Sequence, residues 1–442
     1  MRVKKPAVLR NLIHAYIPGF IVEDTVTIPE WQTRAAVHPA PGVMEFDETP
    51  PEVMRLGDRW NVGYDDTRFF DADVAVPADF AGRKVYLCID FGGEAIVRIN
   101  GKIVGAVSSR ANSGWVGRNE ILFPQPLAAG QVLHIELEAA VDCGGFCDYA
   151  MAGAKYMTYE LRQAELQLIN EEAEGLYFDL ACAYEAYERA NDPVTAGRIY
   201  NAVEKAAHIP DYDQGKARFY ADAPKARKAL WEALGKIESV LPGGVIMAGH
   251  SHLDVAWLWT VNEITRKCAR TFSNNLALMD AYPDFHFTQS QAAVYWFIKE
   301  YYPELWPRIR EKVRAGQWEI TGNTWVEADT NLASGESLVR QLLYGRAFFL
   351  KEFGVSSDIY WLPDCFGFTA ALPQIIKRSG MKYFFTSKLN GNDTNEFPVS
   401  VFRWRSHSGD EVLAYRTVNG FVFVECGAVK GWVHASYLSE LG

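Results

Sequence analysis

The sequence has few cysteines, no excess of basic residues and no long apolar run. Its seven cysteines are scattered along the 442 residues, and an odd, scattered set favours free thiols over a disulfide framework. Reduced thiols are typical of a cytoplasmic protein. Cys143 and Cys147 have no second pair of ligands at the spacing of a structural zinc site. The cysteines therefore predict a cytoplasmic location and no cysteine-based metal centre.

The charge balance excludes some partners. A formal charge of -11 leaves no basic face of the kind that binds nucleic acid. No apolar stretch approaches the length that spans a bilayer. The contents of 49% hydrophobic and 22% charged residues are those of a globular protein, and chains of this length form roughly two to four domains. We therefore expect a multidomain protein with neither nucleic acid nor a membrane as partner.

The first third of the chain predicts β structure. Residues 1–55 carry weak signals and several prolines, and we interpret them as an N-terminal arm packed on a later domain. Residues 56–150 predict a β-sandwich-like domain, because short strands follow one another closely with turn residues between them. Asn100-Gly101 is a strong signal for a type I′ hairpin turn. Apolar and polar residues alternate most clearly in 84–90, 95–99 and 133–137.

The pattern then becomes helical. Leu176, Leu180 and Tyr184 are four residues apart and form one apolar stripe, so we interpret 151–241 as a helical connector. From 242 to 442 predicted strands alternate with predicted helices, which is typical of a (β/α) catalytic domain, either a barrel or a doubly wound sheet. The predicted strands are 285–288, 318–321, 358–362 and 382–386, and the predicted helices are 295–313, 335–353 and 371–379.

Active sites of such folds lie at the carboxyl ends of the strands, where this chain carries polar residues. His252 and Asp254 follow an apolar strand and project to the same side, since side chains two apart do so on extended chain. An imidazole and a carboxylate at this spacing suit a divalent metal, with zinc as the first candidate. His250 has the same parity. Taken alone, the pair fits an ordinary polar strand end more often than a metal site.

Three later clusters also follow predicted strands, at 325–331, 361–368 and 386–390. Asp364 could complete a metal site or attack an anomeric carbon, and it could equally cap the helix that follows. Cys365 has no evident base nearby, so we interpret it as a packing residue.

Four motifs, in order and at matching spacing over about 243–416, resemble the zinc-dependent α-mannosidases of glycoside hydrolase family 38, most closely the cytosolic and bacterial branch. They are His250-Ser251-His252-Leu253-Asp254-Val255-Ala256-Trp257-Leu258-Trp259, Thr324-Trp325-Val326-Glu327 through Gly335-Glu336, Trp361-Leu362-Pro363-Asp364-Cys365-Phe366-Gly367, and Lys388-Leu389-Asn390 through Phe397-Pro398. The resemblance reverses the balance for the His252 and Asp254 pair in favour of a metal site.

The resemblance implies a role for each matching residue. One zinc ion per chain would bind to His252, Asp254 and Asp364, and would hold the 2- and 3-hydroxyls of a mannoside. Asp364 would also be the catalytic nucleophile and form a glycosyl-enzyme that water hydrolyses with retention. Trp257 and Phe366 would line the sugar subsite, and Lys388 would contact the substrate.

Two family features have no match here. The acid/base carboxyl of this branch lies downstream in a Gly-Asp-Gly-Gly-Gly type segment, which the sequence lacks. His407 and His434 come too early to be the family's fourth zinc ligand. We therefore expect the chain to correspond to an N-terminal portion, with a C-terminally incomplete catalytic domain and little α-mannosidase activity by itself.

The sequence thus predicts a zinc-dependent retaining α-mannosidase that cleaves terminal α-mannosides of oligosaccharides or glycan fragments in the cytoplasm and that could form a homo-oligomer. Two alternatives remain open. One is a metal-dependent carbohydrate deacetylase, in which zinc activates a water for amide hydrolysis. The other is a sugar- or metal-binding remnant without catalytic activity.

Overall fold

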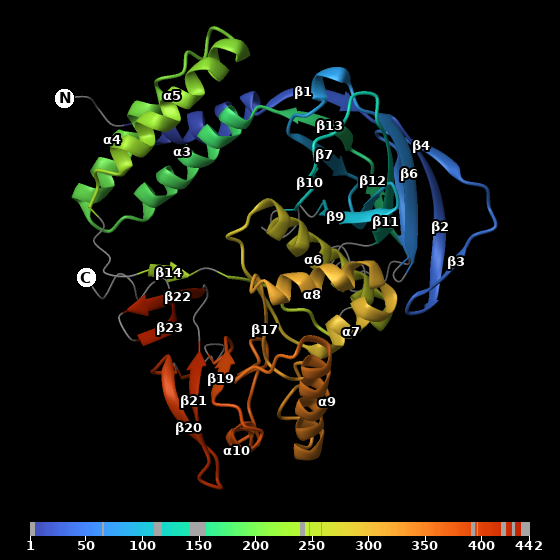
Figure 1. Cartoon of the computed structure of the whole chain (residues 1–442), viewed down its shortest axis with the longest axis vertical. Helices are drawn as coiled ribbons and strands as arrows, with labels where there is room; N and C mark the ends of the chain where they lie inside the picture. Colours follow the sequence, from blue (N-terminus) through green and yellow to red (C-terminus); the bar gives the residue numbers. More distant parts are fainter. Residues whose placement is uncertain are drawn as a thin grey trace.

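A computed structural model of the chain describes residues 5–63, 66–109, 117–140, 156–238, 244–246, 248–257, 259–389, 394–395, 397–416, 421–426 and 429–434. It is a mixed α/β structure with three regions (Figure 1). A strand-rich region runs from blue to teal, a helical region is green, and a region of alternating strands and helices runs from yellow to red. The predicted helical segment 151–241 begins with two strands, β12 (Tyr156–Glu160) and β13 (Gln163–Ile169), which belong to the strand-rich region, and its helices start only at Glu171.

The strand-rich region contains two large antiparallel sheets that share one core, and β5 and β12 form a separate two-stranded antiparallel sheet beside them. The first has the order β1-β13-β7-β10, and the second the order β3-β2-β6-β11-β8-β9 with β4 added on β2. Leu87 and Leu166 of the first sheet pack with Phe70, Val97 and Ile135 of the second, which is the arrangement of a β-sandwich. The strands are β1 (Val22–Thr27), β2 (Glu30–Ala40), β3 (Val43–Phe46), β4 (Glu52–Arg55), β5 (Arg59–Gly63), β6 (Thr67–Ala75), β7 (Val85–Asp90), β8 (Glu94–Ile99), β9 (Lys102–Ser108), β10 (Glu120–Leu122), β11 (Val132–Ala140), β12 (Tyr156–Glu160) and β13 (Gln163–Ile169).

The hairpin between β8 and β9 has the predicted turn. Ile99 pairs with Lys102, so Asn100 and Gly101 are the two central residues. Their φ angles are 51° and 75°, and a type I′ turn requires positive φ at both positions. The local turn chemistry therefore sets the register of this hairpin.

Residues 5–55 contribute to two regions. The helical segments α1 (Pro6–Asn11), η1 (Leu12–Tyr16) and η2 (Ile17–Phe20) bury Ile13 and Ile17 against the helical region. Strands β1 to β4 join the sandwich, where Trp31 is fully buried. The sequence did not predict these strands, because their period is weak and prolines interrupt it. The domain boundaries at 55, 150 and 241 stay predictions.

The helical region is a bundle of α3 (Glu171–Arg189), α4 (Pro193–Ala207) and α5 (Lys216–Leu234). The predicted stripe of Leu176, Leu180 and Tyr184 is buried on the inner face of α3. Side chains of Asn170 and Asp192 accept hydrogen bonds from backbone N–H groups of the first turns of α3 and α4, which accounts for where these helices begin.

The third region contains parallel ladders covered by helices. Strands β15, β16 and β17 pair in parallel, as do β18, β19 and β21, while β20 is antiparallel to β21. The elements are β14 (Gly244–Ile246), β15 (Gly249–His250), α6 (Val261–Ala281), β16 (Phe287–Gln289), α7 (Ala292–Tyr301), η4 (Pro303–Leu305), α8 (Trp306–Arg314), β17 (Trp318–Ile320), α9 (Gly335–Phe353), β18 (Ile359–Trp361), α10 (Leu372–Arg378), β19 (Tyr383–Thr386), β20 (Val401–Arg405), β21 (Glu411–Arg416), β22 (Phe421–Cys426) and β23 (Val429–His434).

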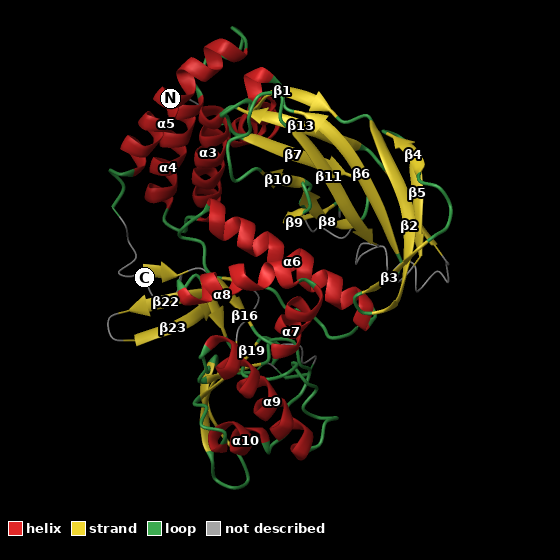
Figure 2. Cartoon of the chain, turned by 45° about the vertical axis from the view of Figure 1, so that its right-hand side comes forward, coloured by secondary structure: helices red, strands yellow, loops and turns green. Residues whose placement is uncertain are grey.

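Helix α6 joins this region to the sandwich. It lies against β8 and β9 (Figure 2), and Ile96 and Ile103 of these strands pack with Phe272 of the helix in one core. The side chain of Asn274 accepts a hydrogen bond from the backbone N–H of Ala106 at 2.8 Å. The sandwich and the α/β region are therefore held together by a continuous apolar and polar interface.

The apolar content of the helices and the state of four cysteines can be examined in the described residues. No helix there combines the length and the apolar character needed to cross a membrane. Cys88, Cys268 and Cys365 are buried free thiols, whereas Cys182 is an exposed one. The predicted absence of a metal site at 143–147 falls outside the described residues.

Candidate metal centre

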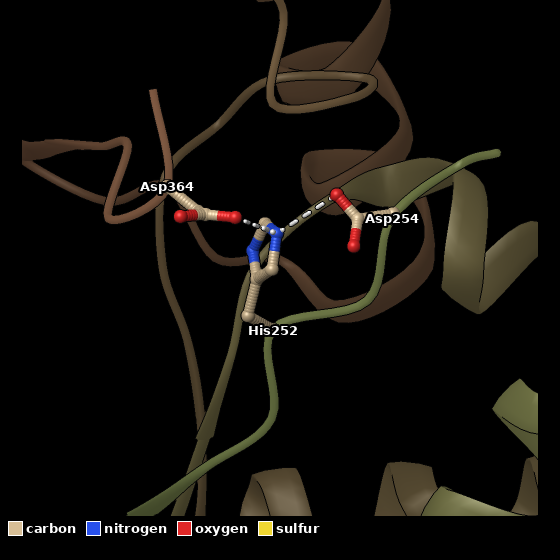
Figure 3. Close-up of side chains that lie close together, drawn as sticks. All are labelled: His252, Asp254 and Asp364. Atoms are coloured by element: carbon tan, nitrogen blue, oxygen red, sulfur yellow. Dashed lines mark hydrogen bonds and ion pairs between the residues drawn. The ribbon is translucent and has the colours of Figure 1, made fainter. Parts of the chain in front are cut away.

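The carboxyl ends of the short parallel strands bring polar side chains together. His252 and Asp254 lie in the loop after β15, and Asp364 lies in the loop after β18. Figure 3 shows the imidazole of His252 between the two carboxylates. One ligand atom of each residue lies within 4.8 Å of the other two. The three predicted ligands thus form one cluster, although they come from loops far apart in the sequence.

The spacing of the donor atoms fits a small divalent ion. Nε2 of His252 lies 3.1 Å from Oδ1 of Asp254 and 3.4 Å from Oδ2 of Asp364. In a tetrahedral site with bonds of about 2.1 Å, neighbouring donor atoms are about 3.4 Å apart. The three side chains are 25 to 33% exposed, so the cluster is open on one side. One nitrogen and two carboxylates therefore form a possible His/Asp/Asp metal site.

The cluster holds a proton on the imidazole when no metal displaces it. Burial acts to lower the pKa of His252, but its contacts with Asp254 and Glu327 outweigh burial and raise the pKa to about 10. A metal ion and this proton compete for the same nitrogen, since only a neutral imidazole can be a ligand.

His250 has the sequence parity of His252 but a different environment. Its Nδ1 lies 2.8 Å from the backbone oxygen of Thr288, to which it donates, and its Nε2 accepts from the indole N–H of Trp361 at 3.3 Å. Burial lowers the pKa of His250. Both ring nitrogens are occupied in a neutral ring, so His250 is a partly buried residue beside the cluster and does not join it.

Asp364 is shared between the cluster and a lysine. While Oδ2 faces His252, Oδ1 lies 2.8 Å from Nζ of Lys388 in the loop after β19. Lys388 also lies over the ring of Phe366, 5.3 Å from its centroid. The lysine side chain is 38% exposed, so it balances the charge of the carboxylate without closing the site.

The interpretation of Asp364 as a helix cap is wrong. Helix α10 begins at Leu372, and the residue before it, Ala371, makes no side-chain capping bond. Asp364 lies well before that helix. Cys365 is buried, and its thiol contacts the backbone oxygen of Gly367 at 3.3 Å, which agrees with a packing role.

Exposed aromatic rings lie on the loops that carry the cluster. Trp257, three residues after Asp254, is 59% exposed, and Phe366, two residues after Asp364, is 79% exposed. Trp257 packs edge-to-face on Trp259, with ring centroids 5.4 Å apart. Large exposed rings next to a polar cluster are typical of a ligand-binding surface.

Two residues that support the cluster were not among the predicted ligands. Glu327, in the loop after β17, has a side chain that is only 2% exposed and lies 2.9 Å from Nδ1 of His252. Gln291, after β16, donates from Nε2 to the backbone oxygen of Leu253 and accepts the backbone N–H of Glu327. The position of Glu327 at a predicted strand end was the available signal, and its contact could not be read from spacing.

The loops after β16 and β17 hold uncommon backbone conformations. Gln291 and Asn323 have φ angles of 64° and 56°. The side chain of Asn323 bonds the backbone of Ser357 in both directions, which fixes its loop. Backbone strain of this kind persists only where surrounding bonds enforce it, and it concentrates at functional sites.

Comparison with known proteins gives the family. Residues 242–423 match the model described as the glycosyl hydrolases family 38 N-terminal domain. "Alpha-mannosidase G" of Dictyostelium discoideum is 36% identical over 354 residues, which cover 78% of this chain and 32% of that protein. An "Alpha-mannosidase" of Saccharomyces cerevisiae is 42% identical over 179 residues, covering 40% of this chain and 16% of that protein.

A solved α-mannosidase from Enterococcus faecalis V583 is 22% identical and covers 38% of this chain and 19% of that chain, with a TM-score of 0.35. The chain spans about a third of the length of the first curated relatives it matches. The matched residues contain all three side chains of the metal cluster. The resemblance stated from the motifs is confirmed: residues 242–423 form an N-terminal domain of glycoside hydrolase family 38.

Proposed function

We propose that this chain contributes the metal and nucleophile side of a zinc-dependent retaining α-mannosidase. Its substrates are terminal α-mannosides of oligosaccharides or glycan fragments, and it acts in the cytoplasm. The observation that carries the proposal is the His252, Asp254 and Asp364 cluster, because it lies at strand ends inside the matched family 38 domain. The names of the curated relatives support the same activity.

The donor set favours zinc, which binds imidazole and carboxylate in a four-coordinate site. When bound, zinc would polarise and orient two neighbouring hydroxyls of the sugar. His252 and Asp254 would hold the zinc ion in place, and through it the position of the sugar. The exposed rings of Trp257 and Phe366 would pack on the apolar faces of the sugar.

Asp364 is the proposed nucleophile. An oxygen of its carboxylate forms a bond to the anomeric carbon while the bond to the leaving group breaks, and water later displaces the carboxylate. Two inversions give net retention. Lys388, whose Nζ lies 2.8 Å from Oδ1, pairs with the carboxylate and orients it for attack.

A retaining enzyme also needs an acid/base carboxyl about 5 Å from the nucleophile. Glu327 is held by His252 and Ser290, and one oxygen of Asp329 accepts two backbone N–H groups of its own turn. Asp393 lies outside the described residues. We therefore assign the acid/base role to none of these carboxylates.

The proposal extends to architecture. Helices and parallel strands alternate from β15 to β19, which supports a (β/α) barrel-type catalytic domain over 242–442. Residues 1–55, 56–150 and 151–241 are the proposed arm, sandwich domain and helical connector that precede it, and the strands β1 to β4, β12 and β13 of the first and third segments add to the strand-rich region.

Covalent trapping in the zinc-loaded 442-residue chain tests the proposal. A fluorinated mannosyl fluoride needs no protonation of its leaving group, so the label forms even without an acid/base residue. We expect one mannosyl label on Asp364, located by peptide mass spectrometry. Chelation of the metal should prevent labelling, and the glucose-configured analogue should not label.

The competing outcomes are distinct. A label on Glu327 or Asp329 would mean that another carboxylate is the nucleophile. Release of acetate from an N-acetylated sugar, without any label, would support the deacetylase alternative. The family match and the mannosidase relatives favour the mannoside reaction.

A further inference from the structure

The imidazole of His252 has a second carboxylate on its far side. Nε2 faces Asp254 and Asp364, whereas Nδ1 lies 2.9 Å from Oε2 of Glu327. Neither of these two atoms forms a hydrogen bond of regular geometry among the described residues, so the contact is a close polar contact with a bent geometry. The imidazole of His252 thus has carboxylates next to both of its nitrogens. These contacts favour the one ring orientation in which Nε2 faces Asp254 and Asp364.

Glu327 is itself fixed. Its side chain is 2% exposed, and Oε1 accepts the hydroxyl hydrogen of Ser290 at 2.5 Å. Its backbone N–H donates to Oε1 of Gln291 at 3.0 Å, and the same amide side chain donates to the backbone oxygen of Leu253 at 2.8 Å. These bonds join the loops after β15, β16 and β17, so the carboxylate cannot turn away without breaking several of them.

We propose that Glu327 is a positioning residue for the metal site, which fixes the tautomer and the ring orientation of His252 through Nδ1. Ser290 holds the carboxylate, and Gln291 holds its loop against the ligand loop. Carboxylates that accept from the distal nitrogen of a ligating histidine also make the ligand nitrogen more basic, and their loss typically lowers metal affinity 10- to 100-fold. The inference rests on the metal site of the proposed function.

The metal affinity of the 442-residue chain tests the role of Glu327. Zn²⁺ affinity is measured by competition with a chelating indicator, and the ligand field is followed by the absorption spectrum of the Co²⁺ form. We expect Glu327→Ala to weaken Zn²⁺ binding by roughly 10- to 100-fold and to change the Co²⁺ spectrum, because the ring can then rotate. Glu327→Gln keeps an acceptor of the same shape and should lose less.

Two further variants separate positioning from folding. Ser290→Ala removes one bond to the carboxylate and should weaken Zn²⁺ binding in the same direction by a smaller factor. Glu319→Ala is the matched control: Glu319 is a glutamate on β17 with an exposed side chain, bonded to Thr288 at 3.2 Å. It should bind Zn²⁺ like the parent chain. The free energy of unfolding of each metal-free variant is measured as well, so that a loss of affinity can be distinguished from a loss of folded protein.

The outcomes distinguish the inference from the function it rests on. If the parent chain binds no divalent ion, the proposed metal site fails and the inference with it. If the parent binds Zn²⁺ and Glu327→Ala binds it within threefold, the positioning role alone is wrong. The role is also wrong if the affinity loss of Glu327→Ala disappears once affinities are compared at equal folded fractions.

Discussion

At the scale of single residues, the metal cluster depends on three donor atoms from two loops. Asp254 supplies a carboxylate oxygen 3.1 Å from Nε2 of His252. We expect Asp254→Ala to remove metal binding, because one nitrogen and one carboxylate remain to hold the ion. Zinc per chain after dialysis, measured by elemental analysis, should fall from about one to near zero.

Asp329→Ala is the control for this prediction. Asp329 is a carboxylate after the neighbouring strand, but its oxygen accepts the N–H groups of Asn331 and Leu332 in a turn. Its loss should leave the zinc content unchanged. Full zinc retention in the Asp254 variant would remove this site from consideration.

A substitution of Lys388 should affect the reaction of Asp364 with the sugar without affecting zinc binding. Nζ of Lys388 lies 2.8 Å from the oxygen of Asp364 that faces away from His252. Lys388→Met should therefore leave zinc content intact but slow mannosyl labelling of Asp364 roughly two- to fivefold, because a partly exposed ion pair contributes up to about 1 kcal/mol. Lys382→Met, which breaks an exposed pair with Asp358, should change neither quantity. Unchanged labelling by Lys388→Met would contradict a role for this lysine.

The sequence could indicate which residue types stand at the strand ends, but not which of them meet. His250 and His252 have the same parity on the chain, yet only His252 faces the carboxylates, because Trp361 and Thr288 occupy both nitrogens of His250. The contact between Glu327 and His252 depends on which strands are neighbours. That order is set by tertiary packing and is invisible to spacing rules.

At the scale of elements, helix α9 supports the loop that carries Glu327. The backbone oxygen and the side-chain oxygen of Gln341 accept the N–H groups of Trp325 and Val326 at 2.9 and 2.8 Å. Gly345, one turn later, lies against this loop, and a Cβ there would collide with the backbone of Asn323 and Thr324. The close approach of helix and loop therefore requires glycine at 345.

A matched pair of glycines tests this contact. Gly345→Ala should lower the free energy of unfolding by about 1–3 kcal/mol, since overpacking against backbone exceeds the gain in helix propensity. Gly335→Ala, at the start of the same helix with open space around it, should be neutral or stabilising by up to about 1 kcal/mol. Denaturant unfolding measures both. Equal effects of the two substitutions would contradict the argument.

The same helix shows where local signals suffice. Helix α9 spans Gly335–Phe353 as predicted, because Ser334 caps its first turn and Gly354 ends it with a φ of 72°. The predicted helix 295–313 is instead divided into α7, η4 and α8, with Pro303 and Pro307 at the starts of the second and third segments.

Two other elements were predicted poorly. Helix α6 was missed although Thr260 and Glu263 form the start of a capping box, with the Thr260 hydroxyl accepting the N–H of Glu263. The apolar run before His250 was predicted as one strand. Its first part, β14, pairs with β22 instead, and only Gly249 and His250 join β16. Pairing partners this distant in the sequence leave no local signal.

At the scale of the whole molecule, the sandwich and the α/β region meet in a buried ionic network. Glu263 of α6 pairs with Arg266 at 2.8 Å and with Arg270, while Lys267 and Arg270 reach Glu94 of β8 at 3.1 and 3.2 Å. The sequence predicted the two regions in order but not this interface. Its partners lie about 170 positions apart, and each looks like an ordinary surface charge in its own segment.

The network makes the stability of the whole molecule depend on pH. Burial acts to raise the pKa of Glu263, but Arg270, Arg266 and Lys267 outweigh it and lower the pKa. A carboxyl with a lowered folded-state pKa stabilises the fold above its unfolded value, near 4.5, and loses this contribution as pH falls through the folded value. Acid should therefore weaken the interface between the two regions.

Glu263→Ala tests both the interface and its pH dependence. It leaves buried guanidinium groups without their carboxylate, so the free energy of unfolding at pH 7 should fall by about 3–5 kcal/mol. As pH falls below the unfolded value near 4.5 the difference between variant and parent should shrink progressively, and it should vanish only once the pH passes the lowered pKa of Glu263 in the folded parent. Glu336→Ala, which breaks an exposed pair with Arg340, should stay close to the parent at every pH. Urea unfolding at several pH values measures all three proteins, and a Glu263 difference that grows in acid would show that this carboxylate does not join the two regions as an ion.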